Sequence, residues 1–410
     1  MSVIFPFPLP TTGAFAFSQC IPSTEHYHLI AEADARRARL RDTLKRAKRR
    51  DIQDMVEVVK AIDDYIPYLF TIKRGIEAGG LLLDSEIVTS WRMPLSKSHI
   101  NMVETSRVSA PTIYYEVCMT MLTYALALLA LAEEIYQVGQ ADEKWKQTTA
   151  HLLTAQSILI YLSTHPLQLS TPVPIDLQPS TLSFVVYMIS GSLHLLIIYK
   201  SLPSPSAVSK PPVSSLMSRV SIYALEKFTT AASLLPQALR NDALESWVKE
   251  AKAYSTAVAG RYMAIENESK QNVGVAIAQC AAALAALKSG PAVALLSKPK
   301  LLHKSSSSSA HSSAAKYRGG LQSSMKPLRE ELEKLEKEYR NQNDKLTFQK
   351  IPDIKEVKRN WPSGREVVVP KPEWTPTGSL VSWDDEEDDD EDGNAGPARA
   401  PSYGGQGQYY

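Results

Sequence analysis

Apolar residues recur every three or four positions through most of the chain between residues 114 and 288. This spacing matches the period of an α-helix and indicates long amphipathic helices. Pro166, Pro203 and Pro236 follow such segments, and a proline disfavours helix at the residue before it. The pattern predicts helices over residues 114–139, 143–163, 180–200, 214–236, 243–267 and 268–288. Helices of similar length with short Pro-rich joins predict an all-α fold of stacked helical hairpins, with a tetratricopeptide-like solenoid as one version.

The two ends of the chain show other patterns. Residues 1–24 are apolar and Pro-rich and predict an extended segment, followed by helices over 32–50 and 51–66, the second ended by Pro67. Residues 79–108 are mixed and predict long loops or a small β element around Trp91. A Ser-rich stretch at 301–318 predicts a disordered loop, and residues 325–341 predict one more helix. We therefore expect a domain over 1–355, an extended Pro/Trp segment over 356–383 and a disordered tail over 384–410.

Two uncharged stretches raise the question of membrane spans. Residues 117–132 are uncharged for 16 positions, which is short of the roughly 20 that a bilayer requires. Residues 177–199 are uncharged for 23 positions but include Pro179, several serines and His194. Their apolar residues fall on one helical stripe, so both stretches are interpreted as core helices. The N-terminus lacks a basic region and carries prolines at 6, 8 and 10, which is unlike a secretory signal.

Composition is that of a soluble domain, with 44% hydrophobic and 22% charged residues. Three cysteines lie far apart without a CxxC pair, which favours a reducing, cytoplasmic setting. The net charge of +1 hides an asymmetry, because residues 384–392 are nine consecutive acids. The first 383 residues hold 44 basic and 35 acidic residues and carry +9. A basic body of this kind fits an anionic partner or surface.

No catalytic, metal or cofactor motif is present. The chain has no HExxH, no P-loop, no GxSxG elbow and no GxGxxG after a strand. His26 and His28 lie two apart, but no third ligand accompanies them. We expect a protein that is not an enzyme and holds no cofactor.

One predicted helix concentrates positive charge, with nine cations against one acid, Asp42, in 15 positions. Three interpretations remain open: a solvated face neutralised by acids elsewhere in the fold, contact with an anionic membrane or acidic partner, and, least favoured, nucleic-acid binding. Nucleic acid is disfavoured because no aromatic platform accompanies the cations. The residues are Arg36, Arg37, Arg39, Arg41, Lys45, Arg46, Lys48, Arg49 and Arg50.

Six segments in order resemble the BRO-domain family: YYEVCMTMLTYALALLALAEEI (114–135), KWKQTTAHLLTAQSILIYLSTH (144–165), DLQPSTLSFVVYMISGSLHLLIIYK (176–200), SWVKEAKAYSTAVAGRYMAIE (246–266), NESKQNVGVAIAQCAAAL (267–284) and YRNQNDKLTFQKIP (339–352). One departure is that the family's "AQAQE" phrase is replaced by SGSLH at 190–194. The resemblance implies an elongated, banana-shaped body around a tetratricopeptide-like core. It also implies a shallow apolar groove for the C-terminal amphipathic helix of the ESCRT-III core subunit.

Carried over by position, the groove residues are Leu196, Leu216 and Val220. The opening PFPLPTTGAF and the acidic, Gly/Tyr-rich tail resemble the stand-alone members that act in fungal alkaline-pH signalling. The resemblance thus implies a cytoplasmic adaptor, recruited peripherally to the plasma membrane or endosomes, with ESCRT-III and a pH-sensing receptor complex as partners. The alternatives are a general endosomal-sorting BRO protein and a curved membrane-binding module whose basic helix is the main contact.

Overall fold

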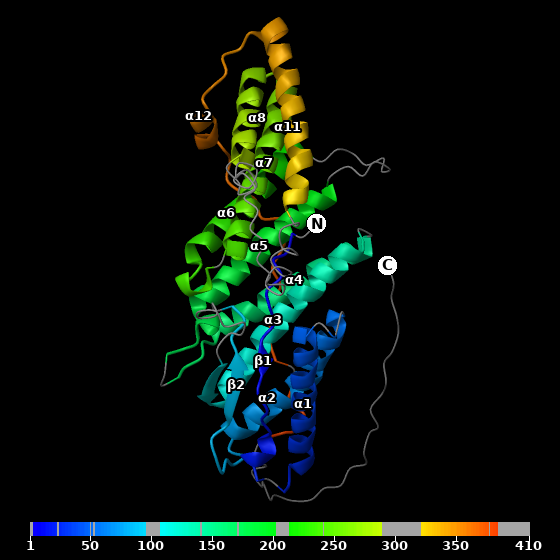
Figure 1. Ribbon diagram of the computed structural model, residues 1–410, viewed down its shortest axis with the longest axis vertical. Coiled ribbons are helices and arrows are strands. Elements are labelled where there is room, and N and C mark those ends of the chain that lie inside the picture. The colour runs from blue at the N-terminus through cyan, green and yellow to red at the C-terminus, as the bar shows by residue number, and fades with distance from the viewer. Residues whose placement is uncertain are drawn as a thin grey trace, which may run out of the picture.

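A computed structural model describes residues 3–22, 24–49, 51, 54–95, 107–139, 142–169, 172–201, 213–240, 242–288, 321–376 and 378–383. Helices dominate these residues and form an elongated body (Figure 1). The helices are α1 (Tyr27–Arg49), α2 (Met55–Glu77), α3 (Ile113–Val138), α4 (Asp142–Thr164), α5 (Pro179–Ser201), α6 (Ser214–Leu234), α7 (Asp242–Ser269), α8 (Val273–Lys288), α11 (Gln322–Gln342) and α12 (Ile354–Arg359). The all-α class, with one small β element, is confirmed. The predicted 301–318 loop and 384–410 tail lie outside the described residues.

The helices stack in chain order. Each helix from α1 to α8 packs against the next, and α11 returns to pack on α8 and α7. Apolar faces of this stack merge into one hydrophobic core that runs from Val3 to Tyr339. Helical pairs that share a continuous core in this way are the arrangement of helical-repeat proteins. The predicted tetratricopeptide-like core is thereby confirmed.

The two apolar helices lie inside this core. α3 and α5 are long and apolar enough to cross a membrane, but their most hydrophobic windows are 89% and 78% buried within the protein. Burial against neighbouring helices removes the same apolar area from water that a bilayer would. Both helices therefore serve as core helices here, as their sequence pattern predicts.

Pro67 does not end the second helix, and that prediction is wrong. α2 continues to Glu77 with Pro67 inside it. The turns that follow bury Leu69 and Ile72 completely, while Thr71 Oγ1 donates to the Pro67 carbonyl at 2.7 Å. Proline removes one helical hydrogen bond and crowds the preceding turn. Burying the next two turns outweighs that cost.

Three short strands cover the N-terminal end of the stack. β2 (Val88–Arg92) pairs antiparallel with β3 (Arg107–Pro111), and β1 (Thr11–Thr12) pairs with the other edge of β2. The register places Trp91 opposite Val108 on one side and Thr12 on the other. Trp91 is fully buried. The predicted β element around Trp91 is confirmed, and the N-terminal segment supplies its third strand.

A buried ion pair connects this sheet to the first three helices. Arg37 Nε of α1 donates to Glu116 Oε1 of α3 at 2.8 Å, and both side chains are 0% exposed. Tyr65 of α2 and Trp91 of β2 also donate to the Glu116 carboxylate, at 3.2 and 2.7 Å. Burial is the largest single influence and by itself would lower the pKa of Arg37, but Glu116 and Tyr65 together outweigh it and raise that pKa above its ordinary value.

The Arg37 guanidinium also finds hydrogen-bond acceptors other than Glu116. Arg37 donates to the carbonyls of Gly13 and Phe15 and to Thr12 Oγ1, at 3.2, 3.3 and 2.7 Å. Those acceptors belong to β1 and the chain just after it. A buried charge pair is tolerable only when its remaining hydrogen-bonding capacity is filled in this way.

Removing one partner of this pair should be costly. We expect Glu116→Ala to lower the free energy of unfolding by about 3–5 kcal/mol, because Arg37 would remain buried without a counter-charge. Urea denaturation followed by circular dichroism measures the loss. The matched control is Arg46→Ala, which removes an ion pair to Glu57 whose side chains are 43% and 40% exposed. Its cost should stay within about 1 kcal/mol. Equal losses in the two variants would contradict a special role for the buried pair.

Candidate functional site

The basic helix is partly neutralised in the fold. Arg37 is enclosed with Glu116 and cannot face a membrane. Arg36 and Arg39 each lie within 4.0 Å of Asp64, at 3.9 and 3.8 Å, and Arg46 contacts Glu57 at 2.7 Å. At least four of the predicted cations in the described part of this helix therefore have acidic partners. Arg41, Lys45, Lys48 and Arg49 make up the rest of the described basic face, and Arg50 lies outside the described residues.

The three groove residues differ in exposure. Leu196 of α5 and Val220 of α6 lie in the hydrophobic core, at 1% and 0% exposure. Leu216 of α6 is half-buried and packs against the same core. The three belong to two helices, α5 and α6, that pack directly against each other. Of the three, Leu216 has surface that a partner could touch.

A C-terminal strap, defined as residues 361–376 and 378–383, crosses this face. Its first half lies on α6 and α8: Trp361 Nε1 donates to Gln279 Oε1 at 3.0 Å, and the Arg365 amide donates to the Arg219 carbonyl at 3.0 Å. The Gly364 amide donates to Glu226 Oε1 at 3.1 Å. Backbone amides of an extended chain therefore bind directly to the surface of α6.

The second half of the strap continues to the N-terminal end. Lys371 Nζ donates to Thr154 of α4 at 2.8 Å, and the Leu380 amide donates to Thr71 Oγ1 of α2 at 3.0 Å. Trp374 packs between Tyr161 and Phe70, with ring centroids 5.2 and 5.5 Å away. Trp383 lies 4.7 Å from His26. The strap thus ties α8 to α2 across the length of the stack.

Glycines allow the strap to approach closely. A Cβ on Gly364 would lie 2.6 Å from the Tyr223 Cα, and one on Gly80 would lie 2.6 Å from the Trp383 ring. Neither position leaves room for a side chain. Each end of the strap therefore makes a contact that requires a glycine, Gly364 within the strap and Gly80 beneath Trp383.

His194 occupies the centre of the strap interface. Its Nδ1 contacts the Ser190 carbonyl at 2.8 Å, and its Nε2 accepts from the Val367 amide at 3.2 Å. This pairing requires the neutral ring with the proton on Nδ1. Burial lowers the pKa of His194, and Lys227 acts in the same direction, whereas Ser190 and Glu366 oppose the shift. The histidine stands at the end of SGSLH, the phrase that departs from the family pattern.

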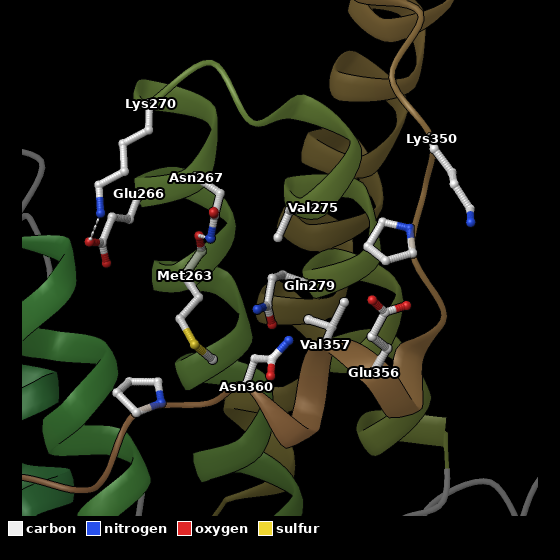
Figure 2. Close-up of a pocket in the computed structure, with 12 residues that line it drawn as sticks. Met263, Glu266, Asn267, Lys270, Val275, Gln279, Lys350, Glu356, Val357 and Asn360 are labelled. Carbon is white, nitrogen blue, oxygen red and sulfur yellow. Dashed lines mark hydrogen bonds and ion pairs between the residues drawn. The ribbon is translucent and has the colours of Figure 1, made fainter.

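A hollow lies farther along the molecule, between α7, α8 and the chain around α12 (Figure 2). This hollow of about 500 Å³ is lined by groups of both charges, among them Glu266, Lys270 and Glu356. Lys270 is engaged by Glu266 at 2.6 Å, and Gln279 is held by Trp361. Its lining contains no serine, cysteine or histidine. Among the described residues, no group of three or more His, Cys, Asp or Glu could hold a metal ion.

Comparison with known proteins identifies the fold family. The BRO1-like domain profile matches residues 19–378, and the chain belongs to this family. The pH-response regulator protein palC of Yarrowia lipolytica is 29% identical, with all of both chains aligned. The palC protein of Emericella nidulans is 26% identical over 91% of this chain and 89% of its own. The resemblance drawn from the six sequence segments is confirmed.

Solved structures agree on the fold. The complex of the ALIX BRO1 domain with CHMP4C matches with a TM-score of 0.67 at 14% identity, covering 93% of this chain and 98% of that one. A Bro1 domain described in the context of endosomal targeting matches with a TM-score of 0.64, covering 90% and 92%. A longer ALIX chain in complex with a viral late-domain peptide has a TM-score of 0.69, and this chain spans 50% of it. At such identities the likeness concerns the fold.

The packing of the strap was not foreseen from the sequence, which predicted only an extended Pro/Trp segment. A signal was nevertheless present, because Trp361, Trp374 and Trp383 recur in it. Tryptophan buries more apolar area than most residues, so three in one extended segment indicate that the segment packs on something.

The fit of Gly364 can be tested directly. We expect Gly364→Ala to loosen the strap, since the overpacking of a close contact costs about 1–3 kcal/mol. The open fraction should rise about five- to a hundredfold, and trypsin cleavage after Arg365 should accelerate with it. Mass spectrometry of the fragments gives the rate. Gly378→Ala is the control, because nothing lies within 4 Å of a Cβ there. Unchanged cleavage in Gly364→Ala would mean that the strap is not held on α6.

The His194 contact should depend on pH. Because the folded-state pKa is lowered from 6.5, the unfolded chain takes up the proton first. The stabilising contribution is therefore complete above about pH 6.5 and is lost as the pH falls through the lowered pKa. We expect the free energy of unfolding to fall less between about pH 7.5 and about pH 5.5 in His194→Asn than in the wild type. In the control His28→Asn, at an exposed histidine, the free energy of unfolding should fall between these two pH values as much as it does in the wild type. An unchanged pH dependence in His194→Asn would contradict the assigned contact.

Proposed function

We propose that this protein is a non-catalytic adaptor in fungal alkaline-pH signalling and that it binds the C-terminal amphipathic helix of the ESCRT-III core subunit. The observation that carries the proposal is the end-to-end alignment with the palC pH-response regulators. The match to the ALIX BRO1 domain in its CHMP4C complex supports the ESCRT-III part. Adaptors of this kind need a rigid surface and no reacting groups, which agrees with a core of packed helices.

The proposed docking surface is the α5–α6 face around Leu216. Recognition of an amphipathic helix requires apolar anchors beside a groove. Leu216 supplies an accessible apolar side chain, while Leu196 and Val220 are buried in the core of the same two helices. The strap contacts α6 at Arg219, one turn beyond Leu216, and again at Glu226, about two turns farther along the helix. A partner helix on Leu216 would lie beside the strap or displace it.

The proposal includes a place in the cell. A pH-sensing receptor complex at the plasma membrane would recruit the cytoplasmic adaptor, and ESCRT-III would hold it there. Two alternatives remain: general endosomal sorting, and a membrane module that uses the basic face of α1. Ion pairs already engage part of that basic face, which weakens the second alternative. Failure to restore growth at alkaline pH in a fungus lacking palC would favour the endosomal-sorting alternative.

Leu216 provides the direct test of the docking surface. We expect Leu216→Asp to weaken binding to the ESCRT-III C-terminal helix by about 2 kcal/mol, roughly thirtyfold, because a charge would face the apolar side of that helix. Isothermal titration calorimetry with the helix as a peptide measures the change. Val220→Asp is unsuitable, because it would place a charge in the core and unfold the protein.

A surface control separates binding from general effects of charge. Leu82→Asp changes another leucine, 77% exposed and outside the α5–α6 face, and should leave the affinity unchanged. Circular dichroism must show that Leu216→Asp remains folded. A folded Leu216→Asp that binds like wild type would refute the site, and a wild type that fails to bind would refute the ESCRT-III proposal itself.

A further inference from the structure

Three exposed apolar side chains follow the end of α11. Leu346 is 74% exposed, Phe348 is 76% exposed and Ile351 is 38% exposed. They belong to the turn that leads from α11 to the chain before α12, at the extremity of the molecule opposite α1 (Figure 1). Exposed large apolar side chains that gather in one place mark an interaction surface. We call residues 343–351 the distal tip.

A network around Asn343 fixes the shape of the distal tip. The Asn343 side chain donates to the Gln349 carbonyl at 3.0 Å and accepts from the Gln349 amide at 2.9 Å. It also accepts from Thr347 Oγ1 at 2.7 Å. Phe348 is thereby held in the left-handed region, with a φ of 48°. That conformation is unfavourable for a bulky residue, so the turn keeps Phe348 exposed at an energetic cost.

The tip is also braced against the turn between α7 and α8. Gln349 Oε1 accepts from the Gly274 amide at 3.0 Å, and Gln349 Nε2 donates to the Gln271 carbonyl at 2.7 Å. Gln271 is itself left-handed, with a φ of 62°. Both non-glycine residues with positive φ in the described chain therefore lie at this one place. Several backbone polar groups of the turn are thus engaged internally, and the side chains that the turn exposes are apolar or charged.

Cations accompany these apolar side chains. Lys345 and Lys350 flank Leu346 and Phe348 in the sequence and are exposed, and neither is ion-paired within the described part of the chain. Lys350 is also one of the residues that line the hollow beside α12 (Figure 2). Asp344 is the single acid between residues 343 and 351. Apolar side chains that project between lysines complement an anionic lipid surface, whose headgroups attract the lysines while its acyl layer takes up the apolar groups.

We propose that the distal tip is a membrane-contact site that inserts Leu346 and Phe348 into anionic phospholipid. The tip lies at the end of the body (Figure 1), so it can reach a lipid interface without rearrangement of the helices. A rigid turn also loses little conformational entropy on insertion. This site is separate from the α5–α6 face and does not depend on the function proposed above.

The first test replaces the apolar wedge and keeps the turn. Asparagine tolerates the left-handed region, so Phe348→Asn should fold at least as stably as the wild type. We expect it to bind vesicles of phosphatidylcholine and phosphatidylserine about tenfold more weakly, measured by flotation of the full-length protein. Val369→Asn, at a residue 83% exposed on the strap, is the matched control and should bind like wild type. Wild-type binding by Phe348→Asn would overturn the proposal.

The second test concerns charge. Each lysine near an anionic surface is worth about 1 kcal/mol, so Lys345→Gln/Lys350→Gln should weaken vesicle binding about thirtyfold. Lys326→Gln/Lys334→Gln, at residues of α11 that are 84% and 76% exposed, removes the same charge elsewhere and should have less effect. Equal effects of the two pairs would mean that attraction is diffuse and would overturn the assignment to the tip.

Insertion itself has an independent readout. All three native cysteines are buried, so a Phe348→Cys variant offers one accessible thiol for an environment-sensitive fluorophore. Its emission should shift to the blue on addition of the anionic vesicles and stay unchanged with phosphatidylcholine alone. An unchanged emission with both vesicles would overturn the proposal. Loss of binding to the ESCRT-III helix in Phe348→Asn, without any vesicle binding by the wild type, would instead assign the tip to a protein partner.

Discussion

The buried pair of Arg37 and Glu116 is the constraint on which the N-terminal half depends. Its hydrogen bonds reach α1, α2, α3, β1 and β2, so these five elements must meet with the correct geometry before either charge is satisfied. A hydrophobic core of the same size would tolerate several arrangements, whereas a desolvated ion pair penalises all but one. The start of α3 is fixed in this way, and the following helices stack on α3 in chain order.

A rigid stack is what makes the strap possible. An extended chain has no hydrogen-bonding partners of its own, so each strap amide needs an acceptor on the body at the correct place. Arg219, Glu226, His194 and Thr71 supply these acceptors from three different helices. Their spacing is set by the helix packing beneath, which in turn is anchored by the buried ion pair at one end. The strap can therefore form all of its hydrogen bonds only when the whole stack of helices is correctly packed.

The sequence predicted what depends on local pattern. Helical periodicity gave the seven long helices from 114 onward to within a few residues, and the mixed composition around Trp91 indicated the small sheet. The end of the second helix is predicted wrongly at Pro67, because the local pattern shows the cost of a proline inside a helix but not the burial of the two turns that follow it. Charge alone groups Arg37 with the other cations of the basic helix, because it does not disclose a buried partner 79 positions away. The burial of Leu196 and Val220 depends on packing between helices, which periodicity cannot resolve.

These differences in packing also decide where the molecule can move. Opening the N-terminal sheet would strand two charges in a low-dielectric interior, which makes local opening there nearly as costly as unfolding. The strap is held instead by exposed or partly buried hydrogen bonds whose groups regain partners in water, so each contributes only about 1 kcal/mol net. Its anchoring tryptophans are separated by stretches in which some apolar residues, such as Val369 and Leu380, face solvent. Motion that couples partner binding to the body should therefore occur in the strap, with the α5–α6 face beneath it remaining fixed.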